Sequence, residues 1–258
     1  MIWTIRPRSK TGALAAVTAG NGPLVVLIHG VGLRAEAWSA QIDALAKDYR
    51  VVAVDMPGHG ESQPFTSPPA LAAYSERIAE VIDEPAIVIG HSFGAMIALD
   101  LAIRHRAKIS GVAALNGIYR RSPNARAAVL ARADSLDGVN IADPAAPLDR
   151  WFGPAPSEER SACENWLRSA DPRGYQDAYR VFAQEDGPQD SDLQTLHCPA
   201  LFLTGGREPN STPAMSEQMA ALAPQGRAEI LTDAAHMAPM THGPEVNRIL
   251  TGFLKETC

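Results

Sequence analysis

One serine stands in a setting that suits a nucleophile. Ser92 is the middle residue of Gly90-His91-Ser92-Phe93-Gly94, which directly follows an apolar run at Ala86–Ile89 and opens an apolar helical stretch. A serine at the tip of a strand must turn sharply into the next helix, so only small residues fit two positions to either side. The helix start also presents free amides and a positive dipole end to the hydroxyl, which suits a developing oxyanion. We therefore expect Ser92 to attack a carbonyl carbon.

A serine of this kind needs a base, and His236 is the best candidate. It follows the apolar run Ala228–Leu231 by a short loop, so it is expected at the same carboxyl edge of the sheet as Ser92. His242, one turn further on, is its only competitor. Three other histidines stand beside glycines at strand ends, where packing or backbone hydrogen bonds are the expected role: His29, His59 and His91.

The base in turn needs a carboxylate that orients it and stabilises the imidazolium. Glu208 lies a few residues after the apolar run Ala200–Leu203, and the chain order serine, glutamate, histidine is the order of nucleophile, acid and base in one class of hydrolase. Asp233 is an alternative acid. It lies on the loop of the histidine itself, where a short carboxylate more easily bonds local backbone.

A second oxyanion donor is expected besides the amide of Phe93. The run Leu24–Ile28 ends in His29-Gly30-Val31-Gly32, where glycines allow the amide of Val31 to turn toward the same edge. A dinucleotide-binding interpretation of these glycines fails, because the third glycine of GxGxxG is missing, and no GxxxxGK[ST] phosphate loop occurs.

The elements that must position these residues follow a regular pattern. Short apolar runs that do not alternate with polar residues are typical of parallel strands covered on both faces, and here they alternate with helical stretches. This predicts a doubly wound α/β fold, and the first residues, Ile2–Ile5 and Ala13–Thr18, could form an antiparallel edge hairpin. The predicted parallel strands are Leu24–Ile28, Val51–Val54, Ala86–Ile89, Ile109–Leu115, Ala200–Leu203 and Ala228–Leu231.

Five segments in this order resemble the α/β-hydrolase superfamily over nearly the whole chain: His29 to Gly32, Asp55 to Ser62, Gly90 to Gly94, the loop from Glu208 to Pro213, and His236 to Pro239. The resemblance implies a mostly parallel eight-stranded sheet with helices on both faces and a small helical cap. It also implies Ser92 as nucleophile, His236 as base, Glu208 as acid and the Val31 and Phe93 amides as oxyanion hole, with no cofactor or metal. The family usually has aspartate at the acid position, whereas this chain has glutamate, which is one methylene longer.

The strand pattern breaks between the sixth and seventh core strands. We therefore expect residues 1–117 and 197–258 to form the core and residues 118–196 to form a cap, since a structureless excursion of this length would be unusual. The cap stretch is rich in aromatic residues, which could fill a small core of its own or line a pocket. Four of them are predicted to contact the substrate: Trp151, Phe152, Trp166 and Tyr175.

Composition disfavours several functions. The net charge is −6 without a basic stripe, which argues against nucleic acid and an anionic membrane surface as partners. Cys163, Cys198 and Cys258 are far apart, which disfavours a zinc site or a disulfide framework. No uncharged apolar run approaches the ~20 residues of a membrane helix, and no secretory signal is evident. We expect a cytoplasmic protein, monomeric or homodimeric, that meets a small molecule.

Within the superfamily, the chain is most similar to small esterases and enol-lactonases. This resemblance implies hydrolysis of an ester or lactone through an acyl-enzyme. A carbon–carbon bond hydrolase of ring-cleavage products is an alternative, although such enzymes often carry an aromatic after the base, where this chain has Met237. A ligand receptor that keeps the triad but turns over slowly is the third interpretation. A dehalogenase is disfavoured, because it would need an aspartate nucleophile in place of Ser92.

Overall fold

One eight-stranded sheet organises the molecule, and the predicted α/β-hydrolase architecture is confirmed. The computed structural model describes residues 3–257. The strand order is β1-β2-β4-β3-β5-β6-β7-β8, with β2 antiparallel to both of its neighbours and all other pairs parallel. The strands are β1 (Ser9–Thr11), β2 (Leu14–Ala19), β3 (Leu24–Ile28), β4 (Arg50–Val54), β5 (Ala86–His91), β6 (Ile109–Leu115), β7 (Ala200–Gly205) and β8 (Gly226–Leu231).

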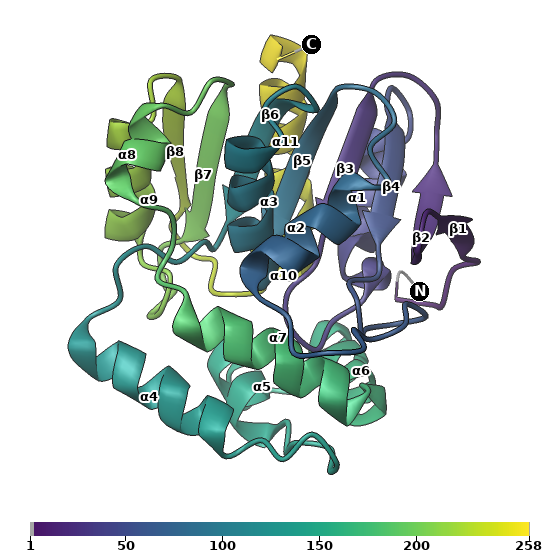
Figure 1. Cartoon of the computed structure of the whole chain (residues 1–258), viewed down its shortest axis with the longest axis vertical. Coiled ribbons are helices and arrows are strands. Elements are labelled where there is room, and N and C mark those ends of the chain that lie inside the picture. The colour runs from purple at the N-terminus through teal and green to yellow at the C-terminus, as the bar shows by residue number, and fades with distance from the viewer. Residues whose placement is uncertain (1–2, 258) are drawn as a thin grey trace.

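The central strands are buried on both faces, as their unbroken apolar sequences require. In β3, Val26 and Ile28 belong to one hydrophobic cluster, while Val25 and Leu27 belong to the cluster on the opposite face. Helices cover both faces of the sheet (Figure 1). The core helices are η1 (Ala35–Trp38), α1 (Ser39–Leu45), α2 (Leu71–Ala79), α3 (Phe93–Arg104), α9 (Pro213–Leu222), α10 (Ala238–Thr241) and α11 (Gly243–Thr257).

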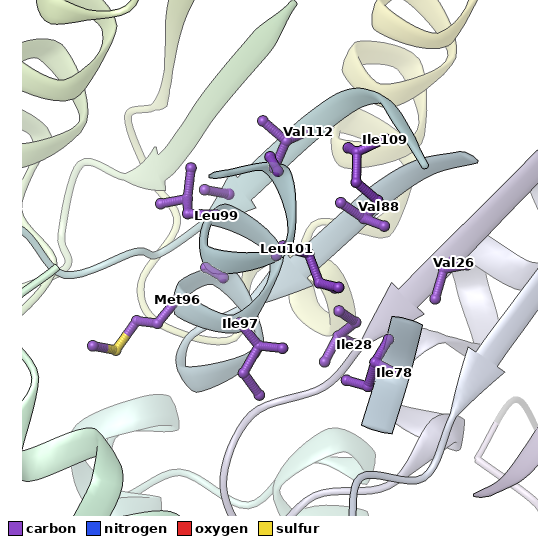
Figure 2. Packing of buried hydrophobic residues seen from close by; sticks show 14 of the residues in the cluster. Val26, Ile28, Ile78, Val88, Met96, Ile97, Leu99, Leu101, Ile109 and Val112 are labelled. Atoms are coloured by element: carbon purple, nitrogen blue, oxygen red, sulfur yellow. The ribbon is translucent and has the colours of Figure 1, made fainter. Parts of the chain in front are cut away.

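Helix α3 fixes the position of the candidate nucleophile. Its apolar residues continue around the helix because it packs among α2, β5 and β6, and nine of its residues are buried. Figure 2 shows Ile97 and Leu101 of this helix close to Ile28 and Ile78, on strand β3 and helix α2. The first turn of α3, which follows Ser92 directly, is therefore held rigidly in the core.

The predicted N-terminal strand at Ile2–Ile5 is wrong in the part that the structure describes. Ile2 lies outside the described residues, Ile5 is 71% exposed, and the outer strand of the hairpin is β1, further along the chain. The physical reason is a pair of arginines that the pattern of apolar residues ignored. The backbone amide of Arg6 and the guanidinium of Arg8 both bond Glu36, and this fixes the preceding segment away from the sheet.

Between β6 and β7 the chain forms five helices, and Figure 1 shows α4 to α7 gathered at one end of the sheet. Their buried residues merge with core residues Leu33, Met237 and Met240 in one hydrophobic cluster, so the helices are packed on the core. Among residues 3–257, none of the helices combines the length and apolar composition that crossing a bilayer requires. The inserted helices are α4 (Pro123–Asp134), α5 (Ala145–Phe152), α6 (Glu158–Ser169), α7 (Pro172–Gln184) and α8 (Asp190–Gln194).

Candidate active site

Ser92 occupies a strained turn between β5 and α3. Its backbone angles, φ 58° and ψ −117°, lie in a region that non-glycine residues rarely adopt and that is common at functional sites. The flanking glycines are required by close backbone contacts. A Cβ on Gly90 would lie 2.0 Å from the carbonyl oxygen of Gly94, and a Cβ on Gly94 would lie 2.1 Å from that of Ile28. The turn therefore presents the serine at the carboxyl end of the sheet.

His236 and Glu208, 28 residues apart in sequence, form a hydrogen-bonded pair. His236 Nδ1 lies 2.7 Å from Glu208 Oε2, and the imidazole has 13% of its surface exposed while the carboxylate has none. The other oxygen, Glu208 Oε1, accepts a hydrogen bond from the amide of Asn210 at 2.7 Å. Both carboxylate oxygens are thus engaged, and the bond to Oε2 orients the imidazole with Nδ1 toward Glu208.

The surroundings keep Glu208 ionised. Burial alone would raise the pKa of its carboxyl, but the neighbouring His236 and two backbone amides outweigh burial and lower the pKa below its ordinary value. The alternative acid is placed elsewhere, because Asp233 is exposed and forms an ion pair with Arg207 at 2.6 Å. The competing base His242 does not line the cavity that holds Ser92.

The loop from Gly30 to Gly32 lies directly against the serine. A Cβ on Gly30 would be 3.1 Å from the Cβ of Ser92, and Gly32 has a positive φ of 75°. His29 braces this loop, since its Nδ1 donates to the Gly30 carbonyl at 2.8 Å and its Nε2 accepts from the amide of Met56 at 3.1 Å. Val31, within this loop, lines the same cavity as Ser92.

His91 forms a backbone hydrogen bond, one of the two roles expected for it from the sequence. Its Nε2 donates to the backbone carbonyl of His236 at 2.7 Å and so ties the base's loop to the strand that ends at the serine. Burial, helped by the nearby His236, lowers the pKa of His91 to about 3, which keeps it neutral. Its position directly before Ser92 was the signal that could have pointed to this tie.

A cavity of about 380 Å³ brings the separate segments together. Ser92, His236 and Val31 all line it, although no hydrogen bond joins the serine hydroxyl to the imidazole among residues 3–257. Catalytic hydrogen bonds are often long before substrate binds. The volume is near the lower end of the ~300–1,000 Å³ range of small-molecule sites.

Two of the four predicted cap contacts line this cavity, Trp151 and Tyr175. The other two, Phe152 and Trp166, do not line it. Both pack instead in the hydrophobic cluster between cap and core, where Trp166 meets Trp3 edge to face with ring centroids 6.4 Å apart. Phe152 follows Trp151 on α5 but points away from the cavity, whereas Trp166 belongs to α6, none of whose residues lines it.

The cavity also contains cap residues that the sequence did not single out as lining it. Tyr179 and Phe182 of α7 continue the aromatic wall, and the arginines of the lining are Arg121, Arg132 and Arg150. Arginines are frequent in the cap, and only the fold shows which of them turn inward. Among the described residues, no three histidine, cysteine or carboxylate side chains gather as a metal site would require.

A buried ion network lies next to the helix that follows the loop from Gly30 to Gly32. Arg8 pairs with Glu36 and with Asp55, each at 2.7 Å, and both carboxylates are fully buried. Asp55 also accepts from the amide of Ala35 at 2.9 Å, and so connects the network to the helix that follows the loop. The segment from Asp55 to Ser62, which resembles the hydrolase family in sequence, forms the turn that wraps this carboxylate.

Comparison with known proteins agrees with the fold described above. A relative from Acinetobacter baylyi, (E)-2-((N-methylformamido)methylene)succinate hydrolase, is 37% identical over 244 residues, 92% of each chain. A 3-oxoadipate enol-lactonase 1 from the same organism is 27% identical over 91% of this chain and 90% of its own. Among solved structures, an esterase from Thermogutta terrifontis superposes with a TM-score of 0.86 at 24% identity, covering 98% of this chain and 99% of its own. The profile of the alpha/beta hydrolase family matches residues 25–249, and this chain therefore belongs to that family.

Proposed function

We propose that the protein is a serine hydrolase that cleaves a carboxylic ester or lactone through an acyl-enzyme. The observation that carries this proposal is the buried Glu208–His236 pair, whose imidazole faces the same cavity as Ser92. Family membership and the hydrolases among its relatives support the general class. The choice of ester or lactone rests on the resemblance to esterases and enol-lactonases.

The proposed reaction uses each side chain in turn. His236 Nε2 takes the proton of the Ser92 hydroxyl as the oxygen attacks the carbonyl carbon, and the amides of Val31 and Phe93 hold the resulting oxyanion. Collapse of this tetrahedral species releases the alcohol, which receives the proton from His236. Water then attacks the acyl-enzyme with His236 again as base, and the acid product leaves. Glu208 stabilises the imidazolium in both halves.

A second candidate is hydrolysis of an N-acyl bond. The 37% identical relative acts on a substrate whose name combines a formamido group with succinate. The same nucleophile, base and oxyanion donors could attack a formamide carbon in place of an ester carbon, with an amine as the leaving group. Cleavage of a carbon–carbon bond would use the same three side chains, and a slowly turning receptor would hold its ligand in the same cavity.

Labelling followed by turnover assays tests the proposal. A fluorophosphonate probe is expected to modify Ser92, mapped by peptide mass spectrometry, and a panel of short esters, lactones and formamides then ranks the bond types. Ser92→Ala should abolish both labelling and turnover. Modification of a different serine, or wild-type turnover by Ser92→Ala, would refute the site. Ligand-induced thermal stabilisation without repeated turnover on any substrate would favour the receptor.

A further inference from the structure

The charge of the cavity is one-sided. Three arginines, Arg121, Arg132 and Arg150, line it together with the catalytic candidates, and among residues 3–257 no aspartate or glutamate does. A cavity with cationic groups and no carboxylate of its own favours an anionic ligand, and exclusion of water strengthens the attraction.

Arg121 is already occupied. Its side chain is almost fully buried, and it donates to Asp186 Oδ1 at 2.9 Å and to the Phe182 carbonyl at 3.0 Å. It also donates to the carbonyl of Glu185. These bonds tie the start of the cap to the end of α7, so the charge of Arg121 is largely neutralised by the protein itself.

Arg132 and Arg150 differ from Arg121, since neither forms an ion pair among residues 3–257. Arg132 lies over the ring of Tyr179, 5.4 Å from its centre, and donates only a long bond of 3.4 Å to the Tyr175 hydroxyl. Its Nε is buried without a partner, and the charge of Asp143 reaches it only at longer range. Arg150 lines the cavity and is exposed, which places it at the opening.

Contacts connect both arginines to the catalytic candidates. Tyr175, whose hydroxyl accepts the bond from Arg132, also packs its ring on the loop from Gly30 to Gly32. A Cβ on Gly32 would lie 2.8 Å from that ring. Arg132 is therefore one tyrosine ring from that loop. Arg150 directly precedes Trp151, whose indole stacks on the imidazole of His236. The two free guanidinium groups thus belong to the wall that a substrate would touch while its carbonyl lies at Ser92.

We propose that Arg132 and Arg150 bind a carboxylate of the substrate, so that the preferred substrate is a small acyl compound that carries at least one carboxylate besides the bond to be cleaved. The inference rests on the proposed function, since it assigns the substrate class of that same site. A guanidinium offers paired donors that match the two oxygens of a carboxylate, and such charge-assisted bonds are stronger than neutral ones.

Two esters of similar size separate charge from shape. We expect the wild type to have a higher kcat/KM for monomethyl glutarate than for methyl pentanoate, measured by acid release. Arg132→Gln and Arg150→Gln should each lower the ratio of the two kcat/KM values by about 10- to 100-fold, the range expected for hydrogen bonds to charged groups. Arg132→Lys keeps the positive charge but loses the paired N–H donors of the guanidinium, so its ratio should fall less than that of Arg132→Gln.

Arg168→Gln is the matched control. Arg168 lies on α6 in the same cap, is paired with Glu164 at 2.7 Å and does not line the cavity, so its ratio should equal that of the wild type. An unchanged ratio in both cavity variants, or a wild type that prefers the neutral ester, would overturn the proposal. If Arg132→Gln does not fold, the exposed Arg150→Gln and the Arg132→Lys variant still decide it.

Binding without turnover separates failure of this inference from failure of the proposed function. In Ser92→Ala, glutarate should raise the midpoint of thermal unfolding and its diamide, glutaramide, should not, while Arg150→Gln should weaken the glutarate effect. Stabilisation by glutarate in a protein that hydrolyses neither esters nor lactones would reject the proposed hydrolase and support the anion site. Ester hydrolysis without any glutarate effect would reject the anion site and leave the hydrolase.

Discussion

Trp151 stacks on the imidazole of His236, with ring centroids 5.7 Å apart and the planes inclined by 19°. The indole belongs to α5 in the insertion between β6 and β7, whereas the histidine belongs to the loop after β8. The proposed base is therefore held from two sides, by Glu208 at its Nδ1 and by the cap at one face of its ring.

Removal of this aromatic cover should slow the reaction. We expect Trp151→Ala to lower kcat by up to about 10-fold, because the stacking contact of ~0.5–1.5 kcal/mol that holds the ring is lost. Trp151→Phe should recover part of the rate. Steady-state kinetics on the best ester measure both. Trp166→Phe is the control, since it alters the buried cluster away from the cavity. An equal loss of kcat in that variant would show that cap packing, rather than the stack, is responsible.

Glu208→Gln should be much more harmful to catalysis than to folding. The amide carries no charge to stabilise the imidazolium and can present a donor to Nδ1, so kcat should fall by about 10³- to 10⁴-fold. Asp233→Asn is the matched control, because this carboxylate lies on the histidine's loop but pairs with exposed Arg207. Comparable losses in the two variants would mean that Asp233 contributes as acid.

The free energy of unfolding should decrease at acidic pH, because the buried carboxylate of Glu36 becomes protonated. Burial opposes ionisation, but hydrogen bonds to Arg8 and Arg6 and the charge of Arg8 outweigh it and lower the pKa of Glu36 from 4.5 to about 2. A lowered pKa in the folded state gives stabilisation that is complete above the unfolded value and is lost as pH falls from about 4.5 toward 2. The linked free energy is at most about 3 kcal/mol.

Urea unfolding of the wild type and of Glu36→Gln at several pH values measures this term. The difference in unfolding free energy between them should be largest at neutral pH and should narrow as the carboxyl of the wild type becomes protonated. A difference that stays constant from pH 7 to pH 2 would contradict the assignment.

Glycine substitutions should distinguish the elbow from an ordinary helix. Gly94→Ala places a methyl 2.1 Å from the carbonyl oxygen of Ile28, which is backbone and cannot move aside, so we expect a loss of at least about 1–3 kcal/mol of stability. Gly252→Ala lies in α11 with nothing within 4 Å of the added methyl and should stabilise by about 0.5–1 kcal/mol. Thermal and urea unfolding compare the two. A tolerated alanine at Gly94 would mean that the elbow can open.

The sequence predicted the fold and the serine turn correctly where only one residue type suits the local geometry. Glycines at fixed distances from Ser92, and apolar runs that end at a common edge, predicted the strands and the place of the elbow. The residue pattern favoured Glu208 over Asp233 as the acid, and the coordinates place the Glu208 carboxylate beside the imidazole, with Asp233 paired to Arg207.

The sequence did not predict side-chain positions that depend on contacts between residues far apart in the chain. Phe152 and Trp166 are aromatic like Trp151, but only the fold shows that Phe152 points away from the cavity and that all of α6, with Trp166, lies off it. The expected strand at Ile2–Ile5 does not form because Arg8, which follows it, is held by two buried carboxylates that are far away in the sequence, Glu36 and Asp55. The role of Arg132 and Arg150 was missed for a related reason, since only the fold shows that neither forms an ion pair with any residue from 3 to 257.

The insertion between β6 and β7 separates, along the sequence, the proposed catalytic groups from the residues that would select the substrate. The proposed catalytic groups follow the carboxyl ends of strands β5, β7 and β8. The residues that would determine substrate selectivity come from α4, α5 and α7. Exchange of that stretch for the corresponding helices of another family member is therefore expected to change substrate preference while the chemical steps persist.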